Sequence, residues 1–209
     1  MFMNAKEMVE GLSQNPELHD ARVLEAMGRV RREAFVPAQL RKMAYADRAL
    51  PLEHDATISQ PYVVAFMTTA ACVSRGSRVL EVGTGSGYQA AVLAEMGVEV
   101  FSVEYVEELA RKAFSRLEEL GYGNVRVRHS DGRQGWVEEA PFDSIMVTAA
   151  SEDIPPPLVE QLREGGRLVI PIGNDSQLLK VFVKTPRGLE PEAQVPVRFV
   201  PLRRVPDRG

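Results

Sequence analysis

The chain has 209 residues, of which 44% are hydrophobic and 26% are charged, and its formal net charge at pH 7 is −4. This balance is typical of a globular protein in water, and it lacks the basic footprint of most nucleic-acid-binding proteins. No apolar run approaches membrane-spanning length, and a single cysteine, Cys72, has no partner for an intrachain disulfide. We therefore expect a cytoplasmic protein without nucleic-acid or membrane partners, in which Cys72 is a buried small hydrophobe.

The N-terminal quarter of the chain is predicted to be mainly helical. Asn4 and Asp20 can cap two short helices, because their side chains accept hydrogen bonds from the first free backbone N–H groups of a helix. We find no internal repeat and no low-complexity linker. We therefore expect a single domain, residues 1–209, in which residues 1–56 form a helical cap over the strand ends of an α/β core of residues 57–209.

A helix entrance is expected in the segment Thr-Ile-Ser-Gln-Pro-Tyr at residues 57–62. Pro61 suits the first turn of a helix that is expected to reach about Ser74. The hydroxyl groups of Thr57 and Ser59 would then lie at the entrance of this helix. Helix capping alone explains a serine or threonine at such a place, so the pattern by itself does not require a functional role.

A strand, a glycine loop and a helix are expected over residues 78–94. Val79, Leu80 and Val82 predict a buried strand, and the Ala/Leu-rich run from Gln89 predicts a helix. The loop and the acid before it comprise Glu81, Gly83, Thr84, Gly85, Ser86 and Gly87. Their G-x-G-x-G spacing matches neither the dinucleotide fingerprint nor the nucleotide-triphosphate loop. Three spaced glycines are more than a turn needs, so we expect a ligand at this helix N-terminus.

Acidic residues are expected at the carboxyl ends of the next two strands. Glu104 ends a strand over residues 98–104, at about the distance from the glycine loop at which nucleotide-binding folds place an acid on the ribose. Asp131 follows a strand over residues 125–130, where an acid could hold an adenine amino group. Each has an ordinary alternative, since Glu104 could be a surface cap of the following helix and Asp131-Gly132 could be a plain turn.

The rest of the chain completes an α/β pattern. Strands are expected over residues 141–150 and 165–173 with a short helix between them, and then over residues 178–185 and 195–202 without one. This order predicts a three-layer αβα sandwich, a doubly wound and mostly parallel sheet with antiparallel C-terminal strands. No His, Cys and Asp grouping has metal-ligand spacing, so we expect no metal.

Several motifs together resemble one enzyme family. They are, in chain order, residues 44–47 (AYAD), 57–62 (TISQPY), 140–143 (APFD), 147–150 (VTAA), 161–167 (QLREGGR) and 199–202 (FVPL). The glycine loop resembles motif I of the S-adenosylmethionine-dependent methyltransferases, and the whole set resembles the protein-L-isoaspartate O-methyltransferase family. The resemblance implies methyl transfer from S-adenosylmethionine to the free α-carboxylate of L-isoaspartyl residues in damaged proteins and peptides. The ester then closes to a succinimide, which can reopen to normal aspartate.

The same resemblance assigns roles to individual residues. Ser59 matches the active-site serine, and Thr57, Ile58, Val147 and Thr148 match positions near the methyl-transfer site. The implied cofactor-binding residues are Glu81, Gly83, Thr84, Gly85, Ser86 and Gly87 in the loop, Glu104 at the ribose, and Ser130, Asp131 and Gly132 on the adenine side. Two positions depart from the family pattern, because Ser130 stands where glycine is usual and Tyr105 stands where arginine is frequent.

The implied chemistry needs no strong general base, because an α-carboxylate with a pKa near ~3.5 is already anionic at neutral pH. A methyltransferase acting on a small molecule or on RNA would share the glycine loop and Glu104, but it would leave residues 57–62 unexplained. A cofactor-binding sensor without activity would not need an intact serine block. We therefore expect a monomeric enzyme whose partners are isoaspartyl-containing proteins and peptides.

Overall fold

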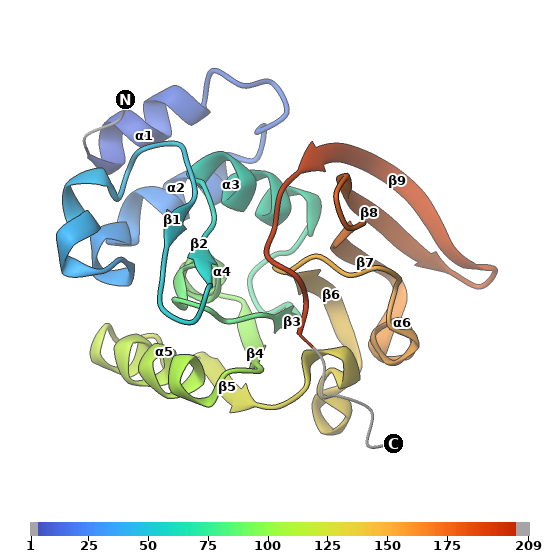
Figure 1. Cartoon of the computed structure of the whole chain (residues 1–209). Coiled ribbons are helices and arrows are strands. Elements are labelled where there is room, and N and C mark those ends of the chain that lie inside the picture. Colours follow the sequence, from blue (N-terminus) through green and yellow to red (C-terminus); the bar gives the residue numbers. More distant parts are fainter. Residues whose placement is uncertain (1–3, 204–209) are drawn as a thin grey trace.

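Figure 1 shows the computed structural model of the chain, which describes residues 4–203. The helices are α1 (Ala5–Leu12), α2 (Ala21–Arg29), α3 (Pro61–Ala70), α4 (Tyr88–Glu95), α5 (Glu107–Glu119) and α6 (Pro156–Gln161), with 3₁₀ helices η1 (Arg32–Phe35), η2 (Ala38–Met43), η3 (Gly132–Gln134) and η4 (Val137–Glu139). The strands are β1 (Leu50–Pro51), β2 (Thr57–Ile58), β3 (Arg78–Val82), β4 (Glu99–Glu104), β5 (Val125–His129), β6 (Phe142–Val147), β7 (Leu162–Ile172), β8 (Gln177–Thr185) and β9 (Gly188–Val197). No helix among the described residues is long and apolar enough to cross a membrane.

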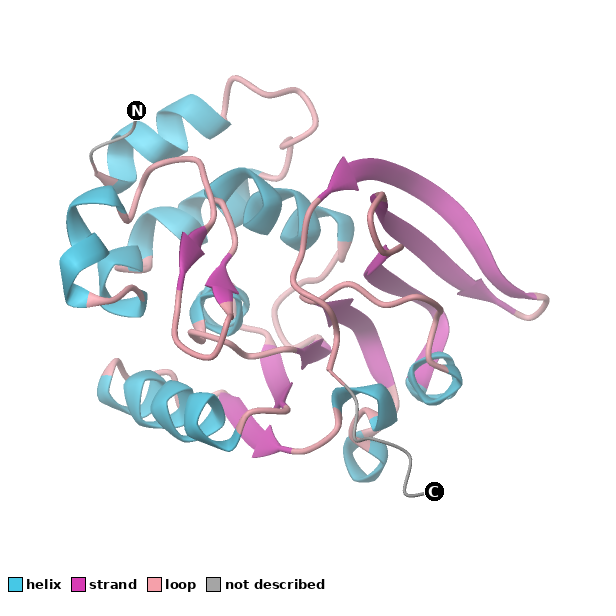
Figure 2. Cartoon of the chain, in the orientation of Figure 1, coloured by secondary structure: helices cyan, strands magenta, loops and turns pink. Residues whose placement is uncertain are grey.

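The central sheet has seven strands in the order β5-β4-β3-β6-β7-β8-β9. The five strands from β5 to β7 run parallel, whereas β8 and β9 are antiparallel to their neighbours. Helices lie on both sides of the sheet (Figure 2). The predicted three-layer αβα sandwich with antiparallel C-terminal strands is therefore confirmed.

Both faces of the parallel strands are buried, which explains their nearly continuous apolar sequences. Successive side chains of a strand point to opposite faces. Val79 of β3 and Val100 of β4 accordingly belong to the core that includes α3 and α4, while Leu80 and Phe101 belong to the core under α6. All four side chains are at most 1% exposed.

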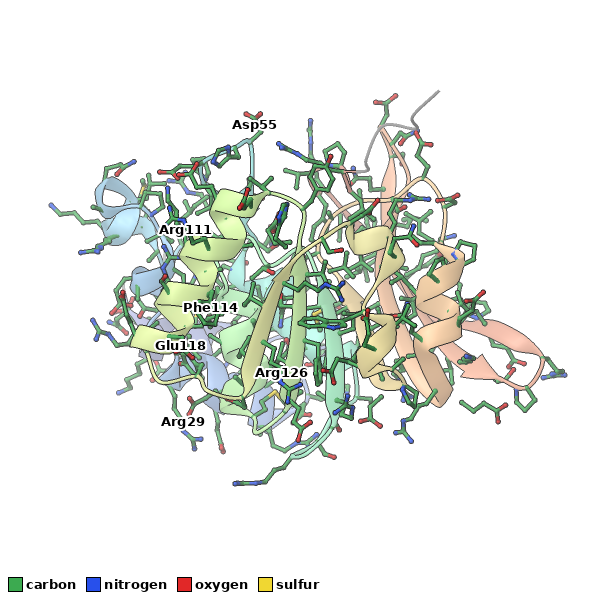
Figure 3. The ribbon with its side chains drawn as sticks, turned by 90° about the horizontal axis from the view of Figure 1, so that it is seen from below. Arg29, Asp55, Arg111, Phe114, Glu118 and Arg126 are labelled. Carbon is green, nitrogen blue, oxygen red and sulfur yellow. The ribbon has the colours of Figure 1, made fainter. Side chains whose placement is uncertain are left out.

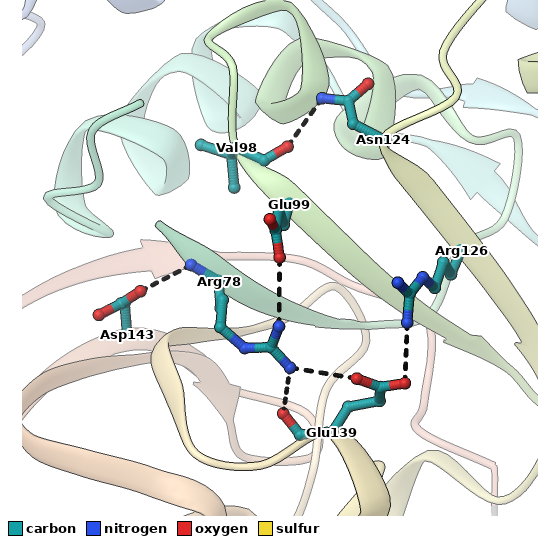
Figure 4. Close-up of polar contacts among 7 residues, drawn as sticks. All are labelled: Arg78, Val98, Glu99, Asn124, Arg126, Glu139 and Asp143. Carbon is teal, nitrogen blue, oxygen red and sulfur yellow. Dashed lines mark hydrogen bonds and ion pairs between the residues drawn. The ribbon is translucent and has the colours of Figure 1, made fainter. Parts of the chain in front are cut away.

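The amino ends of the strands are tied together by polar contacts (Figure 4). The backbone N–H of Arg78 donates to Asp143 Oδ2 at 2.6 Å, which links β3 to β6. The guanidinium of Arg78 pairs with Glu99 and Glu139, each at 3.1 Å, and Arg126 of β5 pairs with Glu139 at 2.9 Å. These ion pairs and hydrogen bonds occupy the amino ends of the strands. A ligand site is therefore expected at the carboxyl ends of the strands.

The N-terminal helices pack against the sheet's helical layer. Asn4 and Asp20 cap α1 and α2 as predicted, each accepting a hydrogen bond from a first-turn backbone N–H. Met8 of α1 and Met27 of α2 are fully buried in the same hydrophobic cluster as Val79 of β3. This shared core supports a single domain, and the division into a cap and a core stays a prediction.

Two expectations about the region before β3 were wrong. α3 ends at Ala70 rather than near Ser74. Cys72 follows in a left-handed conformation with φ of 50° and is exposed, not buried. The side chain of Cys72 points to solvent because the residue lies in the tight turn before β3. The apolar neighbours of Cys72 in the sequence do not predict this turn.

The last strand also differs from the prediction. β9 begins at Gly188, directly after a hairpin turn, and ends at Val197. Residues 198–202, which were expected to extend this strand, leave the sheet instead. Their backbone crosses to the end of β6, where Ala150 N donates to Val200 O at 2.8 Å and Leu202 N donates to Ala150 O at 2.7 Å. The chain thereby brings its C-terminal segment to the ligand edge.

Candidate active site

The order of the strands places a crevice at the carboxyl end of β3. The chain adds β4 and β5 on one side of β3 and then returns to place β6 on the other side. In open α/β sheets, ligands bind at such a switch point. A cavity of about 280 Å³ lies there, and its walls include Gly83, Glu104 and Thr148. Figure 3 shows Asp55, which also lines this cavity, at the opposite end of the molecule from Arg126 at the start of β5.

Glu104 lies in the wall of this cavity at the end of β4. Its Oε2 accepts a hydrogen bond from the Gly85 N–H at 2.8 Å, and its Oε1 accepts one from the Val106 N–H at 2.9 Å. The residue is only 7% exposed, so it is not a surface cap of α5. The two backbone bonds fix the carboxylate, and each oxygen retains a second lone pair. Glu104 can therefore accept hydrogen bonds from two neighbouring hydroxyl groups, such as those of a ribose.

The three glycines of the loop have different surroundings. Gly85 has a φ of 52°, and a Cβ built on it would meet no atom within 4 Å, because it would stand in open space beside the cavity. Gly87 is the N-cap residue of α4 and has a φ of 88°, and a Cβ there would meet Leu117 of α5 at 3.3 Å. The carbonyl of Gly83 accepts a hydrogen bond from Thr148 Oγ1 at 2.5 Å. Gly85 is thus the loop position that leaves room for a ligand, whereas Gly87 leaves room for α5.

Glu81 and Thr84 do not line this cavity, although Thr84 lines a smaller one that also contains Ser59. Ser102 of β4 stands between them: its hydroxyl donates to Glu81 Oε2, and it lies 2.6 Å from Thr84 Oγ1. Glu81 is fully buried, and its Oε1 has no hydrogen-bond partner among the described residues. Burial, together with the nearby charge of Glu104, raises the pKa of Glu81 to about 8. This placement suggests that Glu81 supports the loop from below and does not touch a ligand.

The raised pKa of Glu81 predicts a specific pH dependence of stability. Since the folded-state pKa of about 8 exceeds the ordinary value of 4.5, the stabilising effect of the proton is complete below about pH 4.5 and is lost as the pH rises through about 8. Glu81→Gln keeps a neutral side chain at every pH. Its melting temperature relative to the wild type should therefore be higher at about pH 9 than at about pH 5. Parallel pH profiles of thermal unfolding for the two proteins would contradict the assignment.

A second, smaller cavity of about 40 Å³ holds the predicted serine. Ser59 and Ile58 line it, together with Thr57, Gly83 and Thr148, which also line the larger cavity. The two spaces therefore meet at the glycine loop and at Thr148.

The Ser59 side chain does not cap α3. The helix begins at Pro61 with Gln60 as its N-cap residue, and no side chain makes a capping hydrogen bond there. Within residues 4–203 the Ser59 hydroxyl has no hydrogen-bond partner, and the residue is half-buried. This leaves the hydroxyl available to a ligand in the smaller cavity.

The structure brings only part of the predicted adenine-side segment to the cavity. Gly132 lines the larger cavity, but Ser130 and Asp131 do not. The Asp131 carboxylate accepts a hydrogen bond from the Arg133 N–H at 2.9 Å and so caps η3. Val147 is completely buried in the sheet and also lies outside both cavities. The binding roles of these residues remain predictions.

Residues distant in the sequence cover the cavity. His54 from the β1–β2 hairpin lines it, as do residues 200–203 of the C-terminal segment. Arg203 donates to the carbonyl of His54 at 2.6 Å, and His54 Nε2 lies 2.9 Å from Glu108 Oε2 on α5. No local sequence pattern marks His54 or Arg203 as site residues, because the segments that carry them reach the cavity only when the chain is folded.

These observations define the class of the protein. The crevice offers a carboxylate fixed for two vicinal hydroxyl groups, a glycine that opens on free space, and an apolar wall that includes Leu109. This lining fits an adenosine-containing cofactor held over a G-x-G-x-G loop. The mostly parallel sheet and this site are those of an S-adenosylmethionine-dependent methyltransferase, whose cofactor is S-adenosylmethionine.

Comparison with known proteins gives the family. The model of the family described as protein-L-isoaspartate(D-aspartate) O-methyltransferase matches residues 3–205. A protein-L-isoaspartate O-methyltransferase of Gloeobacter violaceus is 56% identical over 184 residues, covering 87% of this chain and 90% of its own. One of Opitutus terrae is 53% identical over 201 residues, covering 95% of this chain and 86% of its own. The chain therefore belongs to the protein-L-isoaspartate O-methyltransferase family, as the sequence motifs predicted.

Solved structures agree with this assignment. A chain described as a protein-L-isoaspartate O-methyltransferase superposes with a TM-score of 0.85 at 30% identity, covering 94% of this chain and 65% of that one. A Plasmodium falciparum chain, described as a "putative protein-L-isoaspartate O-methyltransferase beta-aspartate methyltransferase" in complex with S-adenosyl-L-homocysteine, superposes with a TM-score of 0.82 at 27% identity, covering 96% of this chain and 98% of that one.

The position of Glu104 predicts a selective loss of cofactor affinity. Hydrogen bonds to a charged group contribute about 1.5–3 kcal/mol each. Glu104→Ala should therefore weaken binding of S-adenosylhomocysteine by at least ~10-fold in calorimetric titration, with the affinity for an isoaspartyl peptide hardly changed. Loss of peptide affinity with unchanged cofactor affinity would show that the carboxylate faces the acceptor instead.

Proposed function

We propose that this chain transfers a methyl group from S-adenosylmethionine to the free α-carboxylate of L-isoaspartyl residues in damaged proteins and peptides. This step initiates their repair through a succinimide. Family membership supports the reaction class and the substrate. The observation that carries the proposal is the junction of two cavities, one with the Glu104 carboxylate and one with the Ser59 hydroxyl, at Gly83, Gly85 and Thr148.

The residues divide into a donor side and an acceptor side. Glu104 and the backbone at Gly85 hold the cofactor, which when bound supplies a methyl group on a positively charged sulfur. Thr57, Ser59 and Thr148 surround the place where the acceptor carboxylate meets that methyl group. Since this carboxylate is already ionised, the residues need only orient it and exclude water from it. Hydroxyl donors suit this role, because they bind an anion without adding a charge.

The acid-rich composition is compatible with such a substrate. The chain has a net charge of −4, but the acceptor cavity is lined by hydroxyl-bearing and apolar side chains and by the amide of Gln89 rather than by carboxylates. The enzyme acts as a monomer in the cytoplasm. Two features support this part of the proposal: the exposed large hydrophobic side chains among the described residues, Phe114 and Val137, lie on separate elements, and the single cysteine suits a reducing compartment.

Discrimination between isoaspartate and aspartate tests the proposed function. In an isoaspartyl residue the backbone passes through the side chain, so the free carboxylate hangs one carbon closer to the chain. A site that grips the neighbouring backbone would align only that carboxylate, and a misplacement of ~1 Å can cost ~100-fold in rate. Two peptides that differ only in Asp or isoAsp should therefore differ by at least ~100-fold in methyl ester formed from tritiated S-adenosylmethionine. Equal methylation of both peptides would refute the proposed substrate, and methylation of neither would refute the activity.

A further inference from the structure

Arg32 stands out among the buried residues, because it is the largest side chain with no exposed surface. Its Nη2 donates to the backbone carbonyl of Ser59 at 2.6 Å, and its Nε donates to the carbonyl of Ala44 at 2.6 Å. Its guanidinium also lies 4.5 Å from the centre of the Tyr88 ring, at the start of α4. Arg32 thus connects the β2–α3 turn, the end of η2 and the helix that follows the glycine loop.

The hydrogen bonds to two carbonyls and the contact with the Tyr88 ring compensate the burial of this charge only in part. Among the described residues, no carboxylate forms an ion pair with Arg32, although the charge of Asp47 acts on its guanidinium from a greater distance. Its Nη1 and the Tyr88 hydroxyl are both buried without a hydrogen-bond partner. A buried charge is costly unless it is paired, and an apolar side chain of similar size is often as stable or more stable in such a place. The cost of burying Arg32 therefore points to a role other than holding the fold together.

We propose that Arg32 is a positioning residue for the methyl-transfer reaction, which holds the backbone at Ser59 so that the Ser59 hydroxyl faces the acceptor. This inference rests on the proposed function of the Ser59 cavity. Charge-assisted hydrogen bonds are the stronger kind, and the rigid fork of a guanidinium can hold two carbonyls at once.

The hydrogen bond from Arg32 acts on a short connection whose two ends are held by other contacts, namely the pairing of Ile58 with Leu50 and the hydrogen bond from Tyr62 N to Asp47. Ser59 lies between β2, which ends at Ile58, and α3, which begins at Pro61, so it belongs to neither element. Its side chain makes no hydrogen bond to any other residue in the described part of the chain. Because Arg32 also lies over the Tyr88 ring, it sets the distance between the acceptor side and the glycine loop. Rates of transfer depend steeply on such distances.

Steady-state kinetics of Arg32→Met test this inference, with Arg29→Met as the matched control. Arg29 is an exposed arginine three residues earlier, whose ion pairs with Glu25 and Glu95 are at 3.7 Å. We expect Arg32→Met to lower kcat for an isoaspartyl peptide by ~30–100-fold, while the affinity for S-adenosylhomocysteine changes by less than ~3-fold. Arg32→Lys keeps the charge but not the fork, and it should be impaired almost as strongly. The control should retain wild-type kinetics.

A double-mutant cycle with Ser59→Ala separates positioning from general damage. If Arg32 acts through the Ser59 hydroxyl, Arg32→Met should cost less than ~3-fold in the Ser59→Ala background. Additive losses would overturn the proposal and assign Arg32 a structural role. Full activity of Arg32→Met, or a loss that follows the unfolded fraction in a thermal scan, would also overturn it. Since the wild-type preference for isoaspartate is measured separately, failure of the positioning role is distinct from failure of the proposed function.

Discussion

Gly85→Val is expected to reduce the affinity for S-adenosylhomocysteine by at least ~1000-fold, a larger loss than that expected for Glu104→Ala. The Gly85 backbone has a φ of 52°, a conformation that β-branched residues rarely adopt. A valine would also project its methyl groups into the space beside the cavity, in which the cofactor is proposed to bind. Moreover, any shift of the backbone to relieve the strain would lengthen the 2.8 Å hydrogen bond from Gly85 N to Glu104.

Gly121→Val is the matched control for this experiment. Gly121 has a φ of 84°, follows the end of α5 and, like Gly85, has no atom within 4 Å of a built Cβ. Valine at either position should strain the backbone and lower the melting temperature to a similar extent, typically by an amount equivalent to about 1–3 kcal/mol. Only the Gly85 variant should lose cofactor affinity in calorimetric titration. Wild-type affinity of Gly85→Val, or equal losses in both variants, would reject the assignment of this loop position.

Ser59→Ala is expected to lower kcat/KM for an isoaspartyl peptide by about 100–1000-fold, the range seen when one positioned hydrogen-bond donor is removed from an active site. The affinity for S-adenosylhomocysteine should be almost unchanged, because Ser59 lines the acceptor cavity and not the larger one. The melting temperature should also hardly change, since the hydroxyl forms no hydrogen bond within the described part of the chain.

Ser77→Ala is the matched control for Ser59→Ala, because it removes a serine hydroxyl that has only a structural role. The Ser77 hydroxyl accepts a hydrogen bond from the Ser74 N–H at 3.0 Å, in the turn before β3 and at the end of the sheet away from the cavity. This variant should lose about 1 kcal/mol of stability and keep full turnover. A Ser59→Ala enzyme that behaves like Ser77→Ala would return Ser59 to a structural role.

Much of the site could be predicted from the sequence because its signals are local. The glycine loop follows β3 in the sequence, so Gly85 must lie near the carboxyl end of that strand. In a parallel sheet the ends of neighbouring strands share one edge, which brings Glu104 to the same place. The hydrogen bond from Gly85 N to Glu104 joins these two predictions.

Glu81 belongs to the same sequence motif but does not line the cavity, because successive side chains of a strand point to opposite faces of the sheet. Glu81 is one residue before Val82 at the end of β3, and its side chain points to the buried helical layer rather than to the cavity. Glu81 stands two residues before the first glycine of the loop, so the sequence pattern does not distinguish a residue that lines the cavity from one that supports the loop. In the folded chain, the hydroxyl of Ser102 contacts both Glu81 and Thr84, which shows that the Glu81 side chain points toward β4.

The amino-acid sequence by itself determined the fold class, the cofactor loop and the family, because periodicity, glycine spacing and motif order are properties of short segments. Only the tertiary structure decided that Arg32 reaches Ser59 across 27 positions of the chain, and that residues 200–203 leave the sheet to cover the cavity. Contacts of this kind depend on how the elements pack. In the sequence alone, Arg32 therefore cannot be distinguished from a surface arginine, because its hydrogen-bond acceptors are backbone carbonyls of distant residues.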